Sequence, residues 1–193
     1  MLLTEEDQNF LKVKIKFLII ILTLFFTSKS YCEKIVLEKL VELDSPWGSS
    51  FISNNEIIVT EKSGKIKIVD ILTNQIQEVD HQLDFVVHGQ GGLLDIIHKD
   101  NIVWISYTED RGNYKTSTSI ARAELNKKKL VFKNIFQANP PIDSGYHFGS
   151  RLAIKDNYIY ASAGERGQGM IAQDASKHPG SIIRVHLDGS IPN

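Results

Sequence analysis

The sequence predicts an all-β fold built from repeated units. Short β-rich runs recur after residue 33, and no amphipathic helix of convincing length interrupts them. Three of the runs directly follow an asparagine, at Asn55, Asn101 and Asn157, at intervals of 46 and 56 residues. A four-stranded unit that recurs every ~40–50 residues is typical of a β-propeller. An ordinary β-sandwich with accidental spacing is the alternative.

The first unit contains a predicted hairpin. Residues 56–61 and 65–70 are rich in β-branched side chains, and Ser63-Gly64 supplies the turn between them. In the next unit, residues 101–107 are expected to pair with 119–125. We expect residues 129–136 to form a third strand of the same group.

The last unit has a second turn signal, Asp156-Asn157, between residues 152–154 and 158–163. A final strand covers residues 181–187 and ends at the turn Asp188-Gly189. At ~40–50 residues a unit, residues 33–193 make three to four blades, and no closing strand follows the last turn. We therefore expect an incomplete propeller, which is either the front part of a longer protein or a truncated product.

The N-terminal residues 1–32 differ from the rest. Three lysines precede an apolar run at residues 17–26, and small or polar residues lead to Cys32. This pattern is typical of a secretory signal peptide, since a membrane span needs about 20 apolar residues. A lipoprotein attached through Cys32 and a retained N-terminal anchor are the alternatives. The expected location is periplasmic or secreted, with residues 33–193 as the propeller domain and without stable membrane insertion of that domain.

The charge gives no reason to expect a nucleic-acid partner. The formal net charge is −1. The densest basic run, residues 127–129, lies between strand-like segments and favours a solvated turn.

Three loops hold the candidate functional residues. The first, residues 88–95, has three glycines around Gln90, which offers both a donor and an acceptor on a small-residue platform. The second places His147 directly ahead of a predicted strand, where a neutral imidazole could act as a general base. A plain glycine-rich turn and a histidine satisfied by local backbone groups are the alternatives.

The third loop, residues 164–174, contains Glu165 and Asp174. Two carboxylates nine residues apart do not form a known calcium loop, so hydrogen bonds that shape the loop are expected instead. The remaining histidines lack zinc-ligand spacing, and no metal ligand is assigned.

Taken in order, these motifs resemble one family. They are Pro46-Trp47-Gly48, the hairpin at residues 59–66, residues 89–95, residues 107–122, residues 147–152, Gly164-Glu165, residues 172–174 and residues 188–192. The chain is similar to the soluble, PQQ-dependent glucose/sorbosone dehydrogenases, and closest to their aldose sugar dehydrogenase branch. The resemblance covers residues 43–193. It implies a six-bladed propeller of which this chain would hold about the first three blades.

The resemblance also implies a mechanism. His147 would take the proton of the anomeric hydroxyl while hydride passes to the quinone, and an aldose would become a lactone. Gln90 would contact the PQQ cofactor, and calcium would hold and polarise the quinone. The sugar substrate and an external electron acceptor are the implied partners. Two departures from the family pattern are Ser181, where lysine is usual, and Tyr146, where the glucose-oxidising relatives have aspartate.

Most cofactor and calcium residues of the family correspond to sequence beyond residue 193. We therefore expect PQQ-dependent oxidation from the full-length protein and little activity from this fragment. A non-catalytic propeller that binds sugar or a protein partner is the alternative. A hydrolytic propeller, such as a lactonase, would need carboxylates in the central channel, and the sequence offers no good set.

Overall fold

The computed structural model describes residues 5–25 and 34–192, which fall into two units, residues 1–38 and 39–193. The first unit contains the helix α1 (Glu5–Phe25). In the part of the chain that is described, no helix combines the length and apolar character that crossing a membrane requires. The expected cleavage site after Cys32 lies outside the described residues.

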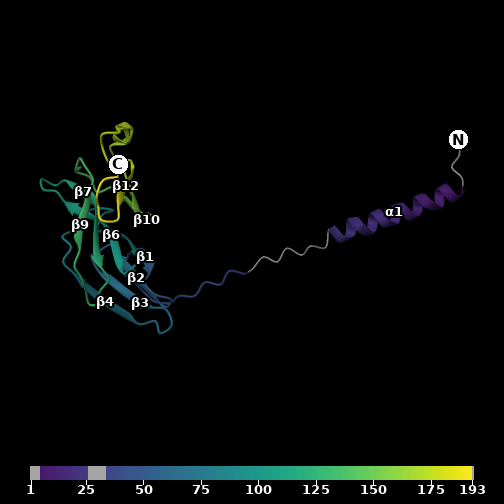
Figure 1. Cartoon of the computed structure of the whole chain (residues 1–193), viewed down its shortest axis with the longest axis horizontal. Coiled ribbons are helices and arrows are strands. Elements are labelled where there is room, and N and C mark those ends of the chain that lie inside the picture. Colours follow the sequence, from purple (N-terminus) through teal and green to yellow (C-terminus); the bar gives the residue numbers. More distant parts are fainter. Residues whose placement is uncertain (1–4, 26–33, 193) are drawn as a thin grey trace. The chain divides into compact units, whose positions relative to one another are not determined.

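The second unit consists of three β-sheets that follow one another along the chain (Figure 1). The first sheet is an antiparallel meander to which the short strand β8 adds in parallel. Its strands are β1 (Pro46–Phe51), β2 (Glu56–Glu61), β3 (Ile66–Asp70), β4 (Ile76–His81) and β8 (Lys129–Leu130).

The second and third sheets repeat this antiparallel order. The second contains β5 (Leu93–Lys99), β6 (Ile102–Asp110), β7 (Thr116–Glu124) and β9 (Lys133–Gln137). The third contains β10 (Gly149–Lys155), β11 (Tyr158–Ala163) and β12 (Ile182–His186), with the short helix η1 (Gly169–Gln173) between its last two strands. Three consecutive meanders of this kind are successive blades of a β-propeller.

Most predicted strand pairs are confirmed, and one prediction is wrong. The hairpin β2–β3 and the pair β6–β7 form as expected. Residues 129–136, however, do not form one strand. They divide into β8, which pairs with β4 of the first sheet, and β9, which pairs with β7 of the second. The division lets this segment bind both sheets, and Leu130 and Phe132 are buried in the core between them.

Two apolar cores lie between consecutive sheets. Ile58 and Ile66 of the first sheet join Ile96 and Ile105 of the second in one core. The other core joins the opposite face of the second sheet to the third sheet, and includes Trp104, Ile120, Leu152, Ile159 and Val185. The second sheet is therefore covered on both faces, which explains why six consecutive residues of β6 are buried.

A hydroxyl side chain stands at the same position in the second strand of every sheet: Thr60, Ser106 and Ser162. Each accepts a hydrogen bond from the backbone N–H of a residue in the first strand of its own sheet, namely Gly48, Asp95 and Arg151, at 3.0, 2.9 and 3.0 Å. In every sheet the strand pairing shifts register at this point. A bulge of this kind bends the strand and re-aims side chains next to it.

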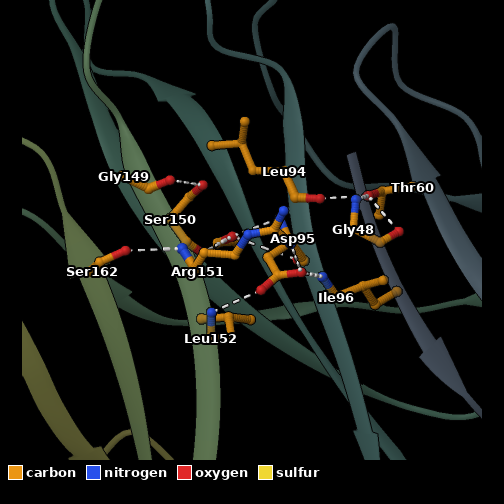
Figure 2. A network of polar contacts seen from close by, with 11 residues as sticks. Gly48, Thr60, Leu94, Asp95, Ile96, Gly149, Ser150, Arg151, Leu152 and Ser162 are labelled. Carbon is orange, nitrogen blue, oxygen red and sulfur yellow. Dashed lines mark hydrogen bonds and ion pairs between the residues drawn. The ribbon is translucent and has the colours of Figure 1, made fainter. Parts of the chain in front are cut away.

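The same hydroxyls join one sheet to the next. Thr60 donates to the carbonyl of Leu94, and Ser106 donates to the carbonyl of Ser150 at 2.7 Å. Figure 2 shows the Asp95 side chain reaching from β5 to β10, where Oδ2 accepts from the N–H of Leu152 at 2.8 Å and Oδ1 from Nη1 of Arg151 at 3.1 Å. These directional polar contacts join specific positions of neighbouring sheets, in addition to the apolar packing between them.

Candidate active site

Strand direction brings the three candidate loops to one end of the sheets. In an antiparallel meander, the loop that enters the first strand lies at the same end as the turn between the second and third strands. Gln90 precedes β5 and His147 precedes β10, the first strands of the second and third sheets. Glu165 follows β11, the second strand of the third sheet. These residues are far apart in the sequence, and the sheet topology places their loops at the same end of the sheets.

The two predicted site residues are in direct contact. The backbone N–H of His147 donates to Oε1 of Gln90 at 2.8 Å. The backbone N–H of Gln90 in turn donates to the carbonyl of Gly145 at 2.8 Å. The loop of the second sheet and the loop of the third sheet are thus held together by reciprocal hydrogen bonds, one on either side of residue 146.

The imidazole of His147 is oriented by Glu165, a role that the sequence did not indicate. Nδ1 of His147 is hydrogen-bonded to Oε1 of Glu165, and this bond is the largest cause that holds the pKa of Glu165 below its usual value of 4.5. The N–H of Gly167 donates to the same oxygen at 3.1 Å. An ionised carboxylate accepts from Nδ1–H, so the other ring nitrogen, Nε2, carries the lone pair. The His147 side chain is half exposed, and Nε2 has no hydrogen-bond partner among the described residues.

The hairpin register explains why the partner is Glu165. If the turn Asp156-Asn157 alone fixed the pairing, position 147 would lie opposite residue 166. The bulge between Gly149 and Leu152 moves the pairing by one residue, so that Gly149 faces Ala163. Continued past the strand ends, this register places His147 opposite Glu165. The extra residue in β10 is therefore the reason that Glu165, and not Arg166, lies opposite His147.

Arg166, which would lie opposite His147 without that shift, is buried and binds the backbone of the loop that carries His147. It is 3% exposed. Nε donates to the carbonyl of Tyr146 at 2.9 Å, Nη1 to the carbonyl of Thr116 at 3.1 Å, and Nη2 to the Thr116 hydroxyl and the Ser144 carbonyl. Its guanidinium also lies 3.6 Å from the ring centroid of Phe148. Burial lowers the pKa of Arg166 to about 10, so the side chain stays charged at neutral pH.

Two glycines allow the loops to approach this closely. A Cβ at Gly164 would lie 1.8 Å from the carbonyl oxygen of His147, and a Cβ at Gly89 would lie 2.4 Å from that of Gly145. Gly89 also has a φ of +58°, which favours glycine. His147 itself has a φ of +50°, an uncommon conformation for a residue with a side chain.

An open hollow of about 550 Å³ reaches the loop that carries Gln90, because His88 is part of its lining. Its lining includes His88, Asp110, Asn113, Tyr114 and Thr116, and Thr116 is also a partner of Arg166. Tyr114 is 87% exposed. The apolar side chains of Val86 and Val87 complete the lining, so the hollow combines apolar and hydrogen-bonding surface, as pockets for small molecules do.

The residues described here do not form a metal site. Between residues 5 and 192, apart from the undescribed stretch 26–33, no group of three or more acidic, histidine or cysteine side chains could hold an ion. Glu165 and Asp174 instead have the expected loop-shaping hydrogen bonds. Asp174 accepts from the N–H and hydroxyl of Ser176, which together with Lys177 lower its pKa to about 2.

Comparison with known proteins assigns the chain to a family. Residues 43–193 match the family model described as glucose/sorbosone dehydrogenase. The chain belongs to this family. It is 29% identical over 162 residues to the aldose sugar dehydrogenase YliI of Escherichia coli, an alignment that covers 79% of this chain and 44% of the relative.

Solved structures agree with this assignment. The soluble aldose sugar dehydrogenase of E. coli, in its apo form, matches with a TM-score of 0.74 and 29% identity over 78% of this chain and 46% of that one. The PQQ-bound aldose sugar dehydrogenase of Streptomyces coelicolor matches with a TM-score of 0.72 and 25% identity, over 80% of this chain and 48% of that one. The chain therefore spans about half the length of the relatives it matches.

Proposed function

We propose that this chain carries the proton-accepting part of an aldose dehydrogenase site, which oxidises a sugar at the anomeric carbon to a lactone. The His147–Glu165 pair is the observation that carries the proposal. It is supported by the family assignment and by the aldose sugar dehydrogenases among the relatives.

In this proposal His147 is the general base. Nε2 would accept the proton of the anomeric hydroxyl, and the resulting imidazolium would be stabilised by the ionised Glu165 at Nδ1. Gln90 would hold the backbone of His147 through its Oε1, which leaves its amide N–H groups available to a ligand. The lost C–H hydrogen leaves as hydride, so the reaction needs a two-electron acceptor.

PQQ is the acceptor that we propose, and it would supply this two-electron chemistry when bound. Two groups among the described residues support this proposal, because they would suit part of such a cofactor. The Gln90 amide offers donors, and the ammonium of Lys62, bound to the carbonyl of Gly89 at 2.8 Å, brings a positive charge to the same loop. Hydrogen-bond donors and a cation suit a quinone that carries carboxylates. The described residues do not fit a calcium ion, and no step is assigned to one.

We propose further that residues 1–32 are a secretory leader and residues 33–193 a partial propeller domain of a periplasmic or secreted protein. An external electron acceptor would then reoxidise the cofactor. Mass spectrometry of the N-terminus after export would test the leader. A mature protein that retains Met1 would contradict it.

The reaction is tested on the full-length gene product with PQQ, calcium and an aldose, by following the reduction of a dye. We expect aldose-dependent reduction that His147→Gln lowers by about 10²–10⁴-fold, the range for loss of a general base. His186→Gln is the matched control, because His186 lies at the end of β12 and stacks on Tyr158. Activity that His147→Gln leaves intact would refute the role of His147.

The fragment of 193 residues provides a second test. With only Gln90, Lys62 and His147 available, it is expected to bind PQQ weakly. Isothermal titration that showed tight, calcium-dependent binding of PQQ to the fragment would contradict this expectation.

A further inference from the structure

The proposed oxidation consists of two separable events at the anomeric carbon, C1 of the sugar. A proton leaves the hydroxyl oxygen, O1, and a hydride leaves C1. The first event requires only a base, whereas the second requires a two-electron acceptor. His147 and Glu165 serve the first event alone, so their chemistry does not depend on whether an acceptor is bound.

His147 is fixed at two points, its backbone and one ring nitrogen. Its backbone N–H donates to Oε1 of Gln90 at 2.8 Å, and its Nδ1 is hydrogen-bonded to Oε1 of Glu165. The N–H of Gly167 donates to the same carboxylate oxygen at 3.1 Å, which helps to hold the carboxylate in place. The other ring nitrogen, Nε2, has no partner among the described residues. The site therefore offers one lone pair on a ring whose orientation is defined.

Loss of the O1 proton has a second outcome, which needs no oxidation. The electron pair left on O1 forms a C1=O1 double bond and expels the ring oxygen, O5, so that the sugar ring opens to an aldehyde. A hydride leaves C1 only when an acceptor takes it, whereas O5 leaves C1 when it receives a proton. Oxidation and ring opening therefore share their first proton transfer and the base that performs it.

One imidazole suffices for both proton transfers of ring opening. O1 and O5 are bonded to the same carbon, so an imidazolium whose Nε2–H has formed at O1 also lies next to O5. The ionised carboxylate of Glu165 stabilises the imidazolium between the two transfers. In total the O1–H and C1–O5 bonds break, the C1=O1 and O5–H bonds form, and His147 returns to its neutral state. The step neither gains nor loses electrons and consumes no co-reactant.

The exposure of the pair suits a proton that has to be returned. The side chain of His147 is 54% exposed and that of Glu165 is 28% exposed. Water screens the attraction between two partly exposed charges, so the carboxylate does not hold the imidazolium too tightly to donate to O5. A fully buried pair would favour the charged imidazole more strongly and would slow its return to the neutral state.

We propose that the His147–Glu165 site also interconverts the two anomers of an aldose, as a mutarotase does, by opening the sugar ring and closing it again. The carbonyl group of the open aldehyde is planar, so O5 adds back to either face of C1. This inference rests on the proton-accepting role of His147 in the proposed function, but it requires no cofactor. It also supplies the oxidation, because an acceptor on one side of the site takes hydride only from the anomer whose C1–H points toward it.

Polarimetry tests the proposal on the full-length gene product, prepared without PQQ, with freshly dissolved α-D-glucose, α-D-galactose or α-D-xylose. The spontaneous rate in the same buffer is subtracted. We expect a saturable acceleration of mutarotation with at least one of these sugars, which His147→Gln lowers by about 10²–10⁴-fold, the range for general acid–base catalysis. His186→Gln is the matched control, because it removes an imidazole that stacks on Tyr158 instead. Circular dichroism would verify that both variants fold.

Glu165 is a positioning residue in this mechanism, and it has a readout of its own. Long-range ¹H–¹⁵N NMR of the wild type should show the proton of the neutral His147 ring on Nδ1. Glu165→Gln removes the charge that stabilises the imidazolium and no longer fixes the tautomer. We expect this variant to show protonation at Nε2 as well and to lower the acceleration by at least about tenfold. An unchanged tautomer with an unchanged rate would contradict the role of Glu165.

Reduction of a dye by the same protein loaded with PQQ separates this inference from the proposed function. Oxidation that depends on His147, without accelerated mutarotation of any of the three sugars, would overturn the inference and leave the proposed function intact. An acceleration that survives His147→Gln would overturn the inference as well. Mutarotation that depends on His147, without any oxidation, would support the inference and refute the proposed dehydrogenase activity.

Discussion

The carboxylate of Asp95 should be the most sensitive polar group at the boundary between the second and third sheets. It is buried and accepts from the buried N–H of Leu152 at 2.8 Å. Asp95→Ala leaves that N–H without a partner, at a cost of about 1–3 kcal/mol. The ion pair with Arg151 adds little, because the Arg151 side chain is 67% exposed and such pairs contribute about 0–1 kcal/mol. We therefore expect a loss of about 2–3 kcal/mol in the free energy of unfolding.

Thermal and urea unfolding, followed by circular dichroism, would measure this loss. At about 2–4 °C per kcal/mol for a unit of this size, Asp95→Ala should lower Tm by roughly 4–12 °C. Asp95→Asn keeps a carbonyl oxygen for Leu152 and should cost about 1 kcal/mol. Arg151→Ala should cost less than about 1 kcal/mol, since it removes only the exposed partner. If Asp95→Ala unfolds like the wild type, or if Arg151→Ala costs as much, the hydrogen bond to the buried N–H of Leu152 does not explain the stability that Asp95 contributes.

Three further predictions concern the loops of the site. Arg166→Met removes the donors that bind three backbone carbonyls and should speed amide hydrogen exchange in residues 144–147 by about tenfold or more, with unchanged exchange in β2 and β3 as the control. Gly164→Ala forces the His147 carbonyl to move and should lower the free energy of unfolding in urea more than Gly112→Ala does. A Cβ at Gly112 meets no atom within 4 Å, so that control should cost only about 1 kcal/mol for its positive φ. Equal costs would contradict the close approach of Gly164 to His147. Because His147 holds the pKa of Glu165 below 4.5, the stability that this bond provides is present above that pH and is lost as the pH falls through the folded-state pKa. Wild type should thus lose more stability than Glu165→Gln between about pH 5 and pH 3, and parallel pH profiles would refute the coupling.

The strands that sequence could predict are those with dense β-branched side chains. β2, β3, β6 and β7 belong to this group, and their pairing follows from short turns. β1 (PWGSSF) and β4 (IQEVDH) lack that density, because one face of each is exposed or covered by polar groups. Residues 129–136 carry no turn signal that would separate two strands. The segment divides into β8 and β9 because it pairs with two neighbouring sheets.

The sequence indicated which residues belong to the site, but not which of them are in contact. The motif order drew attention to Gln90 and His147, which the structure brings together. The orientation of His147 by Glu165 depends on a single-residue bulge in β10. The one local signal for it in the sequence is Gly149, whose positive φ accompanies the irregularity, and a lone glycine does not say which way the register moves.

The hydrogen bond between Gln90 and His147 has a thermodynamic consequence. Gln90 belongs to the second sheet and His147 to the third, so the site exists only while these two sheets are docked. A ligand that binds both residues must therefore stabilise the docked state by the same free energy by which docking strengthens its own binding. Occupancy of the site and cohesion of the two sheets are linked quantities, and a measurement of either one reports on the other.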